Sequence, residues 1–456
     1  MISNSAELAA AGMPAVRALA LRVARAGLEA CDVSRATAQA VELTERGVSI
    51  AGQEYDLDPG ARVIVVGSGK ATLAIASTLE DLLGDRLGGG AIAVRAGTEG
   101  IALERVELLL ADHPLPTERS QAAARRVMQL VDGLGPGDLV IAAFTGGSSA
   151  LTSLPPGGVT QAEKRRLHEL LLGSGAPIVE VNSVRKHVSA IKGGRLAARA
   201  EPARLVNLTV SDVAGDVVDA ITDPSVQDTS TVDDAIEILH RRGLWDGLPA
   251  SIRAHLGSDA AHSPRLSATP QTVLLVNGAG VCEAMAAEAR AAGVAAHVVS
   301  TELEGEAGFV GRHLARLAKG CAREGSPHGP PCVLVGCGGE ATVTLASNGS
   351  GGAFGAGGPN QEAGAAAALE LDGGLPISAC FIDTDGSDGG TDAAGALVDG
   401  LTAARARAAV IDLDAAIAEH RTGKALAELG DLIVTGPTQT NVNDMFVLAV
   451  GMEGAE

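Results

Sequence analysis

Aromatic side chains are scarce in this chain: Phe, Tyr and Trp make up 2% of its 456 residues, against 46% for all hydrophobic types. The core must therefore be built from Ala, Val, Leu and Ile. Residues of this kind are typical of parallel sheets covered by helices. Because the chain is longer than one core usually serves, we expect two domains.

Cysteine is also sparse, and its six positions, 31, 282, 321, 332, 337 and 380, form no CxxC pair and no zinc-finger spacing. A protein of this size needs no disulfide staples, so the pattern predicts reduced core cysteines in a cytoplasmic protein. No apolar run is long enough to span a membrane. Residues 1–30 carry Glu and Arg through a helical period, which indicates an amphipathic first helix rather than a signal peptide.

Positive charge is in deficit, with a formal net charge of −20. This argues against nucleic-acid and membrane partners, which need a positive face. Lysine is the rarer cation, with six residues against 29 arginines. Lys70, Lys186 and Lys192 lie in glycine-marked or polar stretches and are the lysines that we expect to serve chemistry.

Short β-branched runs alternate with helical patterns, which is typical of an α/β doubly wound fold with a Rossmann-like parallel sheet. We predict strands at 61–67, 106–112, 138–144, 204–210, 272–278, 295–300, 331–337, 376–383 and 431–436. The polar stretch 257–271 interrupts this alternation. We therefore expect an N-terminal Rossmann-like domain in residues 1–260 and a C-terminal α/β domain in residues 270–456.

Glycine turns follow several of these strands, at the sheet edge where open α/β proteins bind ligands. The turn GSGKA, residues 67–71, joins a predicted strand to a helix and carries Lys70. It matches neither the Walker A nor the dinucleotide pattern, but a helix start beside an ammonium group suits an anion. A tight turn with a solvated lysine is the other interpretation.

The turn TGGSSA, residues 145–150, offers flexible backbone followed by two serine hydroxyls. A serine-hydrolase elbow would need a glycine where Ala150 stands, so helix capping is the alternative to ligand binding. Further on, residues 182–197 form a predicted helix with Asn182, Arg185 and Lys186 on one or two turns. Such cations favour carboxylate or phosphate recognition, and a solvated basic face is the alternative.

The acidic stretch DTDGSDGGTD follows the strand at 376–383. It begins like a calcium loop but has Asp388 where the loop needs glycine. A solvated turn remains open, as does a strand end that holds a hydrated cation or a substrate hydroxyl. Asp212 and Glu340 also follow predicted strands, which favours binding over chance.

Taken together, GSGKA, DHPLPTERS, VRKHVSAIKGGRLA, GGEATVTL and DTDGSDGGTDAAGALVDG resemble the class II glycerate kinases, or glycerate 2-kinases, whose C-terminal half is the MOFRL domain. The resemblance runs from residue 67 to residue 445. It implies two α/β domains with the active site in the cleft between them, and ATP and Mg²⁺ as cofactors. It also implies phosphorylation of the 2-hydroxyl of D-glycerate or a related small hydroxy acid. The partners would be that acid and a nucleotide, and a homodimer is left open.

The resemblance implies that Lys70 contacts the transferred phosphoryl group. We expect catalytic roles for Lys70, Arg185, Lys186 and Asp385, and a Mg²⁺ site at Asp383, Asp385 and Asp388. The residues expected to bind substrate or phosphate are Ser68, Gly69, Gly146, Gly147, Ser148, Ser149, Asn182, Lys192, Asp212, Glu340 and Asn360.

One departure from the family pattern concerns charge: GGRNQE becomes GGPNQE, so Pro359 replaces an arginine regarded as catalytic. Proline offers neither a charge nor an N–H donor. Two alternatives therefore stay open, a nicotinamide-dependent hydroxypyruvate reductase, an old label for some members, and a catalytically silent ligand-binding relative. The missing GxGxxG turn argues against the reductase.

Overall fold

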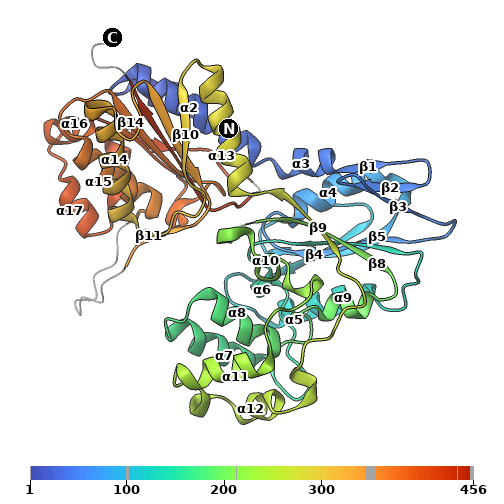
Figure 1. The fold of residues 1–456 in the computed structure, drawn as a ribbon. Coiled ribbons are helices and arrows are strands. Elements are labelled where there is room, and N and C mark those ends of the chain that lie inside the picture. Colours follow the sequence, from blue (N-terminus) through green and yellow to red (C-terminus); the bar gives the residue numbers. More distant parts are fainter. Residues whose placement is uncertain (1, 99–101, 212, 345–355, 439, 452–456) are drawn as a thin grey trace. The chain divides into compact units, whose positions relative to one another are not determined.

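The computed structural model describes residues 2–98, 102–211, 213–344, 356–438 and 440–451 (Figure 1). The chain divides into two compact units. The parallel-sheet unit consists of residues 33–211 and 216–275. The mixed-sheet unit consists mainly of the described parts of residues 1–32 and 276–456.

The parallel-sheet unit is built on a six-stranded sheet in the order β6-β5-β4-β7-β8-β9. The strands from β4 to β8 pair in parallel. The first strand of this sheet in the sequence, β4, lies in the middle, and the winding reverses between β4 and β7, as in the Rossmann fold. The strands are β4 (Val63–Ser68), β5 (Leu87–Arg95), β6 (Val106–Ala111), β7 (Leu139–Phe144), β8 (Arg204–Val210) and β9 (Gln271–Val276).

Helices cover this sheet and also form a cluster of their own. α4 (Thr72–Leu83) and α5 (Glu118–Leu130) pack on the strands. A separate apolar core joins α7 (Gln161–Gly173), α8 (Ile178–His187), α11 (Val232–Arg241) and α12 (Ala250–Leu256), which lie together in Figure 1. A short antiparallel sheet completes the unit, with β1 (Val41–Leu43), β2 (Gly47–Ile50) and β3 (Gln53–Asp56).

The mixed-sheet unit has the strand order β10-β12-β17-β14-β15-β16. β17 runs antiparallel to both β12 and β14, so this sheet is mixed, whereas the composition had suggested parallel sheets. β15 also pairs antiparallel with both β14 and β16, whereas β10 and β12 pair in parallel. The strands are β10 (Ala295–Ser300), β12 (Cys332–Cys337), β14 (Ile377–Asp383), β15 (Gly395–Asp399), β16 (Leu432–Ile433) and β17 (Asp444–Val450).

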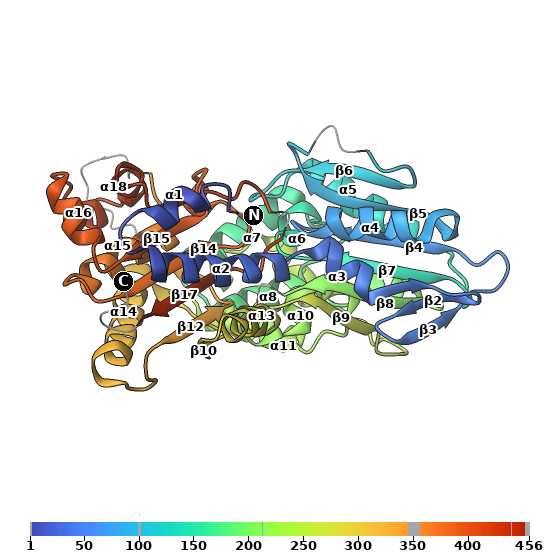
Figure 2. The ribbon, with the colours of Figure 1, turned by 90° about the horizontal axis from the view of Figure 1, so that it is seen from above.

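Two pairs of helices pack on this mixed sheet, as Figure 2 lets the reader follow. α2 (Pro14–Ala30) and α13 (Gly278–Ala291) contact each other and β12 or β17. α14 (Ala307–Glu324) and α15 (Pro359–Leu371) approach so closely that a Cβ on Gly311 would lie 2.0 Å from the carbonyl oxygen of Ala363. Alanine is common in this core, which also contains Phe381 and Phe446.

The first two helices, within residues 2–32, belong to the mixed-sheet unit, which corrects their assignment to a domain of residues 1–260. A turn at Gly12, with φ 65°, separates α1 (Ser5–Ala10) from α2, where one helix was predicted. The guanidinium of Arg17 is fully buried, pairs with Asp399, and lies 2.9 Å from Asp431. This buried charge network attaches α2 to strands more than 380 residues away. The predicted linker at 257–271 lies close to the observed boundary after Leu275.

The structure confirms most predicted strands, although the run at 431–436 contributes only β16. β5, β15, β17 and the three strands of the short antiparallel sheet were not predicted, and in β5 glycines interrupt the apolar pattern. All six cysteines are free and buried, as predicted. In the described part of the chain, no helix combines the length and the apolar character needed to cross a membrane.

Candidate active site

The turns that leave β4 and β7 meet at the point where the winding of the parallel sheet reverses. The backbone N–H of Lys70 donates to the carbonyl oxygen of Gly146 at 2.9 Å, and that of Thr145 donates to Ser68 at 2.9 Å. A Cβ on Gly69, whose φ is 136°, would lie 2.1 Å from Oγ1 of Thr145. Only glycine fits there, so the close approach of the two turns explains the GSGK sequence. Ligands of open α/β sheets bind at this topological position.

Gly147 lies between two functional side chains of this region. Its φ of 86° is left-handed, and a Cβ there would lie 3.3 Å from Nε2 of His113 and 3.8 Å from Cγ of Lys70. Burial lowers the pKa of His113, and the charges of Lys70 and Arg95 lower it further. His113 is therefore a neutral imidazole at pH 7. His113 belongs to the motif DHPLPTERS, whose sequence pattern indicates no role for this residue.

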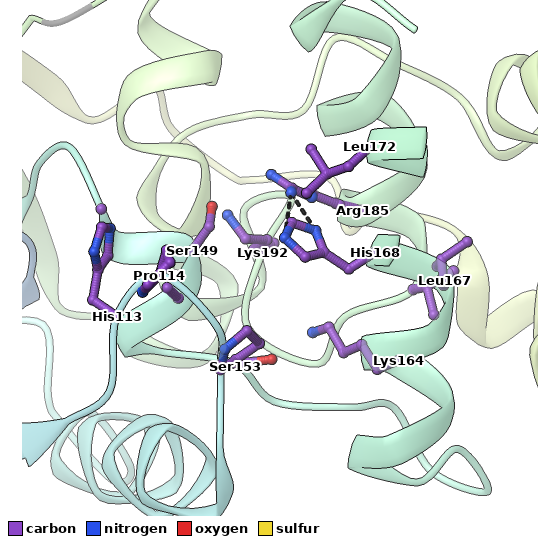
Figure 3. Close-up of a pocket in the computed structure, with 14 residues that line it drawn as sticks. His113, Pro114, Ser149, Ser153, Lys164, Leu167, His168, Leu172, Arg185 and Lys192 are labelled. Atoms are coloured by element: carbon purple, nitrogen blue, oxygen red, sulfur yellow. Dashed lines mark hydrogen bonds between the residues drawn. The ribbon is translucent and has the colours of Figure 1, made fainter. Parts of the chain in front are cut away.

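Beside these turns the parallel-sheet unit forms a pocket of about 230 Å³ (Figure 3). Three basic side chains, Lys164, Arg185 and Lys192, line it together with Ser149 and Ser153. In Figure 3 the amino groups of Lys164 and Lys192 extend toward the side on which Ser149 and His113 lie. The remaining lining residues are His113, Pro114, Pro116, Gly147, Ala150, Leu167, His168, Leu172 and Val188.

Lys164 comes from α7, whose first turn is fixed by a capping box between Thr160 and Glu163. Its Nζ donates to the carbonyl oxygen of Leu154 at 3.0 Å and to Oγ of Ser189 at 3.4 Å. Burial of the ammonium lowers its pKa to about 7, and the charge of Lys192 contributes. In the sequence nothing distinguishes this lysine, because it lies in an ordinary charged amphipathic helix.

Arg185 and His168 form a contact pair on one wall of the pocket. A terminal nitrogen of Arg185 contacts the His168 ring, at 3.1 Å from Nε2. Burial and then the charge of Arg185 lower the pKa of His168 to about 4. Burial lowers the pKa of Arg185 to about 10, so this guanidinium remains charged at pH 7 beside a neutral histidine. Asn182 Oδ1 accepts from Arg185 at 3.5 Å.

The predicted helix at 182–197 is interrupted: α8 ends at His187, because the backbone of Val188 leaves the helix with φ −117° and ψ 49°. A second helix, α9 (Arg195–Ala200), begins only after Gly193 and Gly194, whose φ values are 65° and 75°. Lys192 therefore reaches the pocket from a turn, where its Nζ pairs with Asp223 at 2.7 Å. Lys186 is different, because its buried ammonium lies 2.9 Å from both Asp219 and Asp228 and does not line the pocket.

The parallel-sheet unit thus gathers many of the predicted residues around one region. Ser149, Arg185 and Lys192 line the pocket, and Gly147 joins them to the turn of Lys70 and Gly146. Ser148 is buried at the start of a short helix, Ser148–Leu151. Ser68 is buried too, and its hydroxyl bonds to that of Thr152 at 2.8 Å, so it supports the turn from within.

The predicted acidic residues belong to the mixed-sheet unit, apart from Asp212, which lies outside the described residues. Asp388 is buried and accepts from the backbone N–H groups of Asn360 at 3.0 Å and Gln361 at 2.8 Å. Its carboxylate thus caps the first turn of α15. Burial raises its pKa to about 6. Glu340 is exposed.

The three carboxylates predicted to form a Mg²⁺ site do not form one together. Asp383 accepts from the N–H of Asp385 at 3.0 Å, Asp385 accepts from that of Ser387 at 2.9 Å, and Asp388 is occupied at α15. Across residues 2–98, 102–211, 213–344, 356–438 and 440–451, no three His, Cys, Asp or Glu side chains are grouped to hold a metal ion. Asp383 and Asp385 are only half-buried and could serve as the one or two carboxylates that Mg²⁺ takes alongside phosphate oxygens.

A buried carboxyl group that the sequence argument missed lies opposite this loop. Asp444 on β17 is the register partner of Asp383 on β14. It accepts from Nδ2 of Asn360 at 2.6 Å and from the N–H of Ala341 at 2.8 Å. Burial raises its pKa to about 7, and the charges of Asp388 and Glu340 add to the effect. Asn360, predicted to bind substrate, thus bridges two buried carboxyl groups.

Comparison with known proteins places this geometry in a family. Residues 19–257 match the model described as a domain of unknown function, DUF4147, and residues 332–444 match the MOFRL family. A glycerate 2-kinase of Pyrococcus horikoshii is 36% identical over 441 residues, covering 95% of this chain and 97% of the relative. An Agrobacterium vitis protein with the provisional name hydroxypyruvate reductase is 42% identical over 402 residues, covering 86% of this chain and 88% of the relative.

A solved structure extends the comparison to three dimensions. The crystal structure of a glycerate kinase from Thermotoga maritima has a TM-score of 0.84 and 34% identity, covering 95% of this chain and 98% of the other. The two family matches and the identity over most of the chain have one consequence: this protein belongs to the class II glycerate kinase family, whose C-terminal half is the MOFRL domain.

Proposed function

We propose that this protein transfers the γ-phosphoryl group of ATP to the 2-hydroxyl of D-glycerate, or of a related small hydroxy acid, to give 2-phosphoglycerate. The observation that carries the proposal is the pocket with three basic side chains at the reversal point of the parallel sheet, in a chain whose relatives are named glycerate kinases. A volume of about 230 Å³ suits a small anionic acceptor.

Phosphoryl transfer depends on positioning and charge neutralisation more than on covalent chemistry. The exposed side chain of Lys70, at the start of α4, supplies a positive charge for the transferred group. Gly69 and Gly146 bring backbone close to it without side-chain bulk. Ser149 and Arg185 line the pocket and orient the acceptor.

The cofactor chemistry of this proposal is that of a nucleotide and a divalent cation. Mg²⁺ would neutralise charge on the phosphate oxygens. Asp383 and Asp385 are the carboxylates that would bind it, and their half-exposed position at the end of β14 suits a partly hydrated ion.

The decisive experiment is a coupled ADP-release assay over a panel of C3 and C4 hydroxy acids, with phosphorus NMR to identify the product. We expect D-glycerate to give ADP and 2-phosphoglycerate. Oxidation of NADH with hydroxypyruvate and no ADP release would instead support the reductase alternative. Formation of 3-phosphoglycerate would contradict the assignment of the 2-hydroxyl.

Pro359 is the reason to test whether the protein is a catalytically silent ligand-binding relative, because this first residue of α15 carries no charge. If the protein binds D-glycerate and ATP in calorimetry but releases no ADP, it is a ligand-binding relative. In that case Pro359→Arg should create ADP release, because it places a cation where the family pattern has an arginine. An active wild-type protein would exclude this alternative.

A further inference from the structure

The charges that face Lys164 do not balance. Among the charged groups of the described residues that act most strongly on Lys164, three are the cations Lys192, Arg185 and Arg195, and one is the carboxylate of Asp223. Asp223 is already paired with Lys192 at 2.7 Å. The histidine on the same helix, His168, is neutral because its pKa is about 4. The pocket therefore has an excess of positive charge.

Lys164 is half-buried and differs in its partners from the two buried lysines of this unit, Lys186 and Lys192. Lys186 has two carboxylates at 2.9 Å, which raise its pKa, and Lys192 has Asp223. Lys164 donates only to uncharged oxygens, those of Leu154 and Ser189, and within the described ranges no carboxylate lies within ion-pair distance of it. Both buried lysines of this region thus have a carboxylate as counter-ion, whereas half-buried Lys164, which lines the pocket, has none among the described residues.

The rest of the lining limits the size and polarity of the ligand. Leu167, Leu172 and Val188 make part of the wall apolar, while Ser149 and Ser153 offer hydroxyl groups. The volume of about 230 Å³ falls below the roughly 300–1,000 Å³ of pockets for drug-sized ligands. A short acid fits these walls, with its negative end at the cations and its hydroxyl groups toward the serines.

We propose that Lys164, Arg185 and Lys192 bind the carboxylate of the acceptor, and that Lys164 is the residue that selects an acid over an uncharged alcohol of the same size. This inference rests on the proposed function in that the acceptor is a hydroxy acid. The entering carboxylate is the counter-ion that Lys164 lacks, and the amine takes up one proton from solvent as the ion pair forms.

The pH dependence follows from the pKa of Lys164. In the empty pocket this pKa is about 7, and a bound carboxylate raises it. Affinity for the acid is therefore complete below about pH 7 and declines as the pH rises toward the pKa of the complex. At pH 8, binding should take up close to one proton per site.

Calorimetric titration with D-glycerate at pH 8, in HEPES and in Tris, measures this uptake from the difference in apparent enthalpy. Wild-type protein should take up close to one proton, and glycerol, which lacks the carboxylate, should cause no uptake. Lys164→Met should bind D-glycerate about 10- to 100-fold more weakly and take up none, the range for losing a hydrogen bond to a charged group. Lys164→Arg keeps the charge and should bind without proton uptake.

Lys424→Met is the matched control, because Lys424 is an exposed lysine in the mixed-sheet unit. It should leave affinity and proton uptake unchanged. Proton uptake that persists in Lys164→Met would assign the proton to His113 or His168 and overturn the inference. An unchanged affinity of Lys164→Met for D-glycerate would also overturn it.

The two proposals fail separately. Proton-coupled binding of D-glycerate without ADP release would overturn the proposed function and leave this inference standing. Brisk ADP release with the same KM for D-glycerate in wild type and in Lys164→Met would overturn this inference and leave the proposed function standing.

Discussion

The backbone N–H of Lys70 donates to the carbonyl oxygen of Gly146 at 2.9 Å, which joins the two turns at the reversal point of the parallel sheet through main-chain atoms. The side chain of Lys70 takes no part in that bond. This bond between the two turns therefore does not depend on the type of side chain at position 70.

Replacing Lys70 with alanine should lower kcat at least ~100-fold, the scale for losing one preorganised charge stabiliser. The turn keeps its backbone hydrogen bond, so the melting temperature should change little. Steady-state ADP release and thermal unfolding measure the two effects, and Lys70→Arg should retain part of the activity. Near-normal turnover in Lys70→Ala would remove this lysine from the catalytic mechanism.

Gly147→Ala tests whether His113 needs the space beside that glycine. The new Cβ would lie 3.3 Å from Nε2 of His113 and would also carry the strain of a left-handed residue. Gly158→Ala is the matched control, because its φ of 83° is similar to the 86° of Gly147 and nothing lies within 4 Å of its Cβ position. Both variants should lose stability by about 1–2 kcal/mol in urea unfolding, but only Gly147→Ala should also lose activity. Equal activity in the two variants would mean that His113 tolerates displacement.

Lys186 is expected to stabilise the fold rather than to carry the chemistry. Lys186→Met leaves Asp219 and Asp228 without their shared cation, which should cost about 3–5 kcal/mol of unfolding free energy. Lys186→Met combined with Asp228→Asn should recover part of this loss, since one uncompensated charge disappears. The exposed pair of Arg126 and Glu107 gives the comparison, where Arg126→Met should cost about 1 kcal/mol or less. A stable Lys186→Met variant with strongly reduced kcat would return Lys186 to the catalytic residues.

Asp444 should make the stability of the protein depend on pH. Its folded pKa of about 7 exceeds the unfolded value near 4, so the folded state binds the proton more tightly. This contribution to stability is complete below about pH 4 and is lost as the pH rises to about 7. Asp444→Asn removes this titration. The difference in unfolding free energy between the variant and wild type should therefore shift in favour of the variant as the pH rises from 5 to 8.

Urea unfolding at those two pH values measures the change, and Asp392→Asn serves as the control because Asp392 is an exposed acid of the same acidic stretch. The control should differ from wild type equally at both values. The same behaviour in Asp444→Asn would show that Asp444 is ionised at little cost in the folded protein.

The sequence by itself determined the α/β class, most of the strands and the position of the glycine turns. These features depend on local periodicity and on backbone conformations that only glycine adopts readily, and both can be seen in a short window of residues. It also indicated the turn of Lys70 and the basic segment of Arg185 and Lys192, because charged residues stood out in a lysine-poor chain.

Only the tertiary structure decided what each charged group does. Lys164, Lys186 and Lys192 are chemically identical in the sequence, yet two have carboxylate partners and the third has only uncharged oxygens. Asp223 and Asp228 lie 31 and 42 residues from the lysines that they neutralise, and Asp444 lies 84 residues from Asn360. Desolvation and ion pairing act through space, so a pKa is set by neighbours that the order of residues does not reveal.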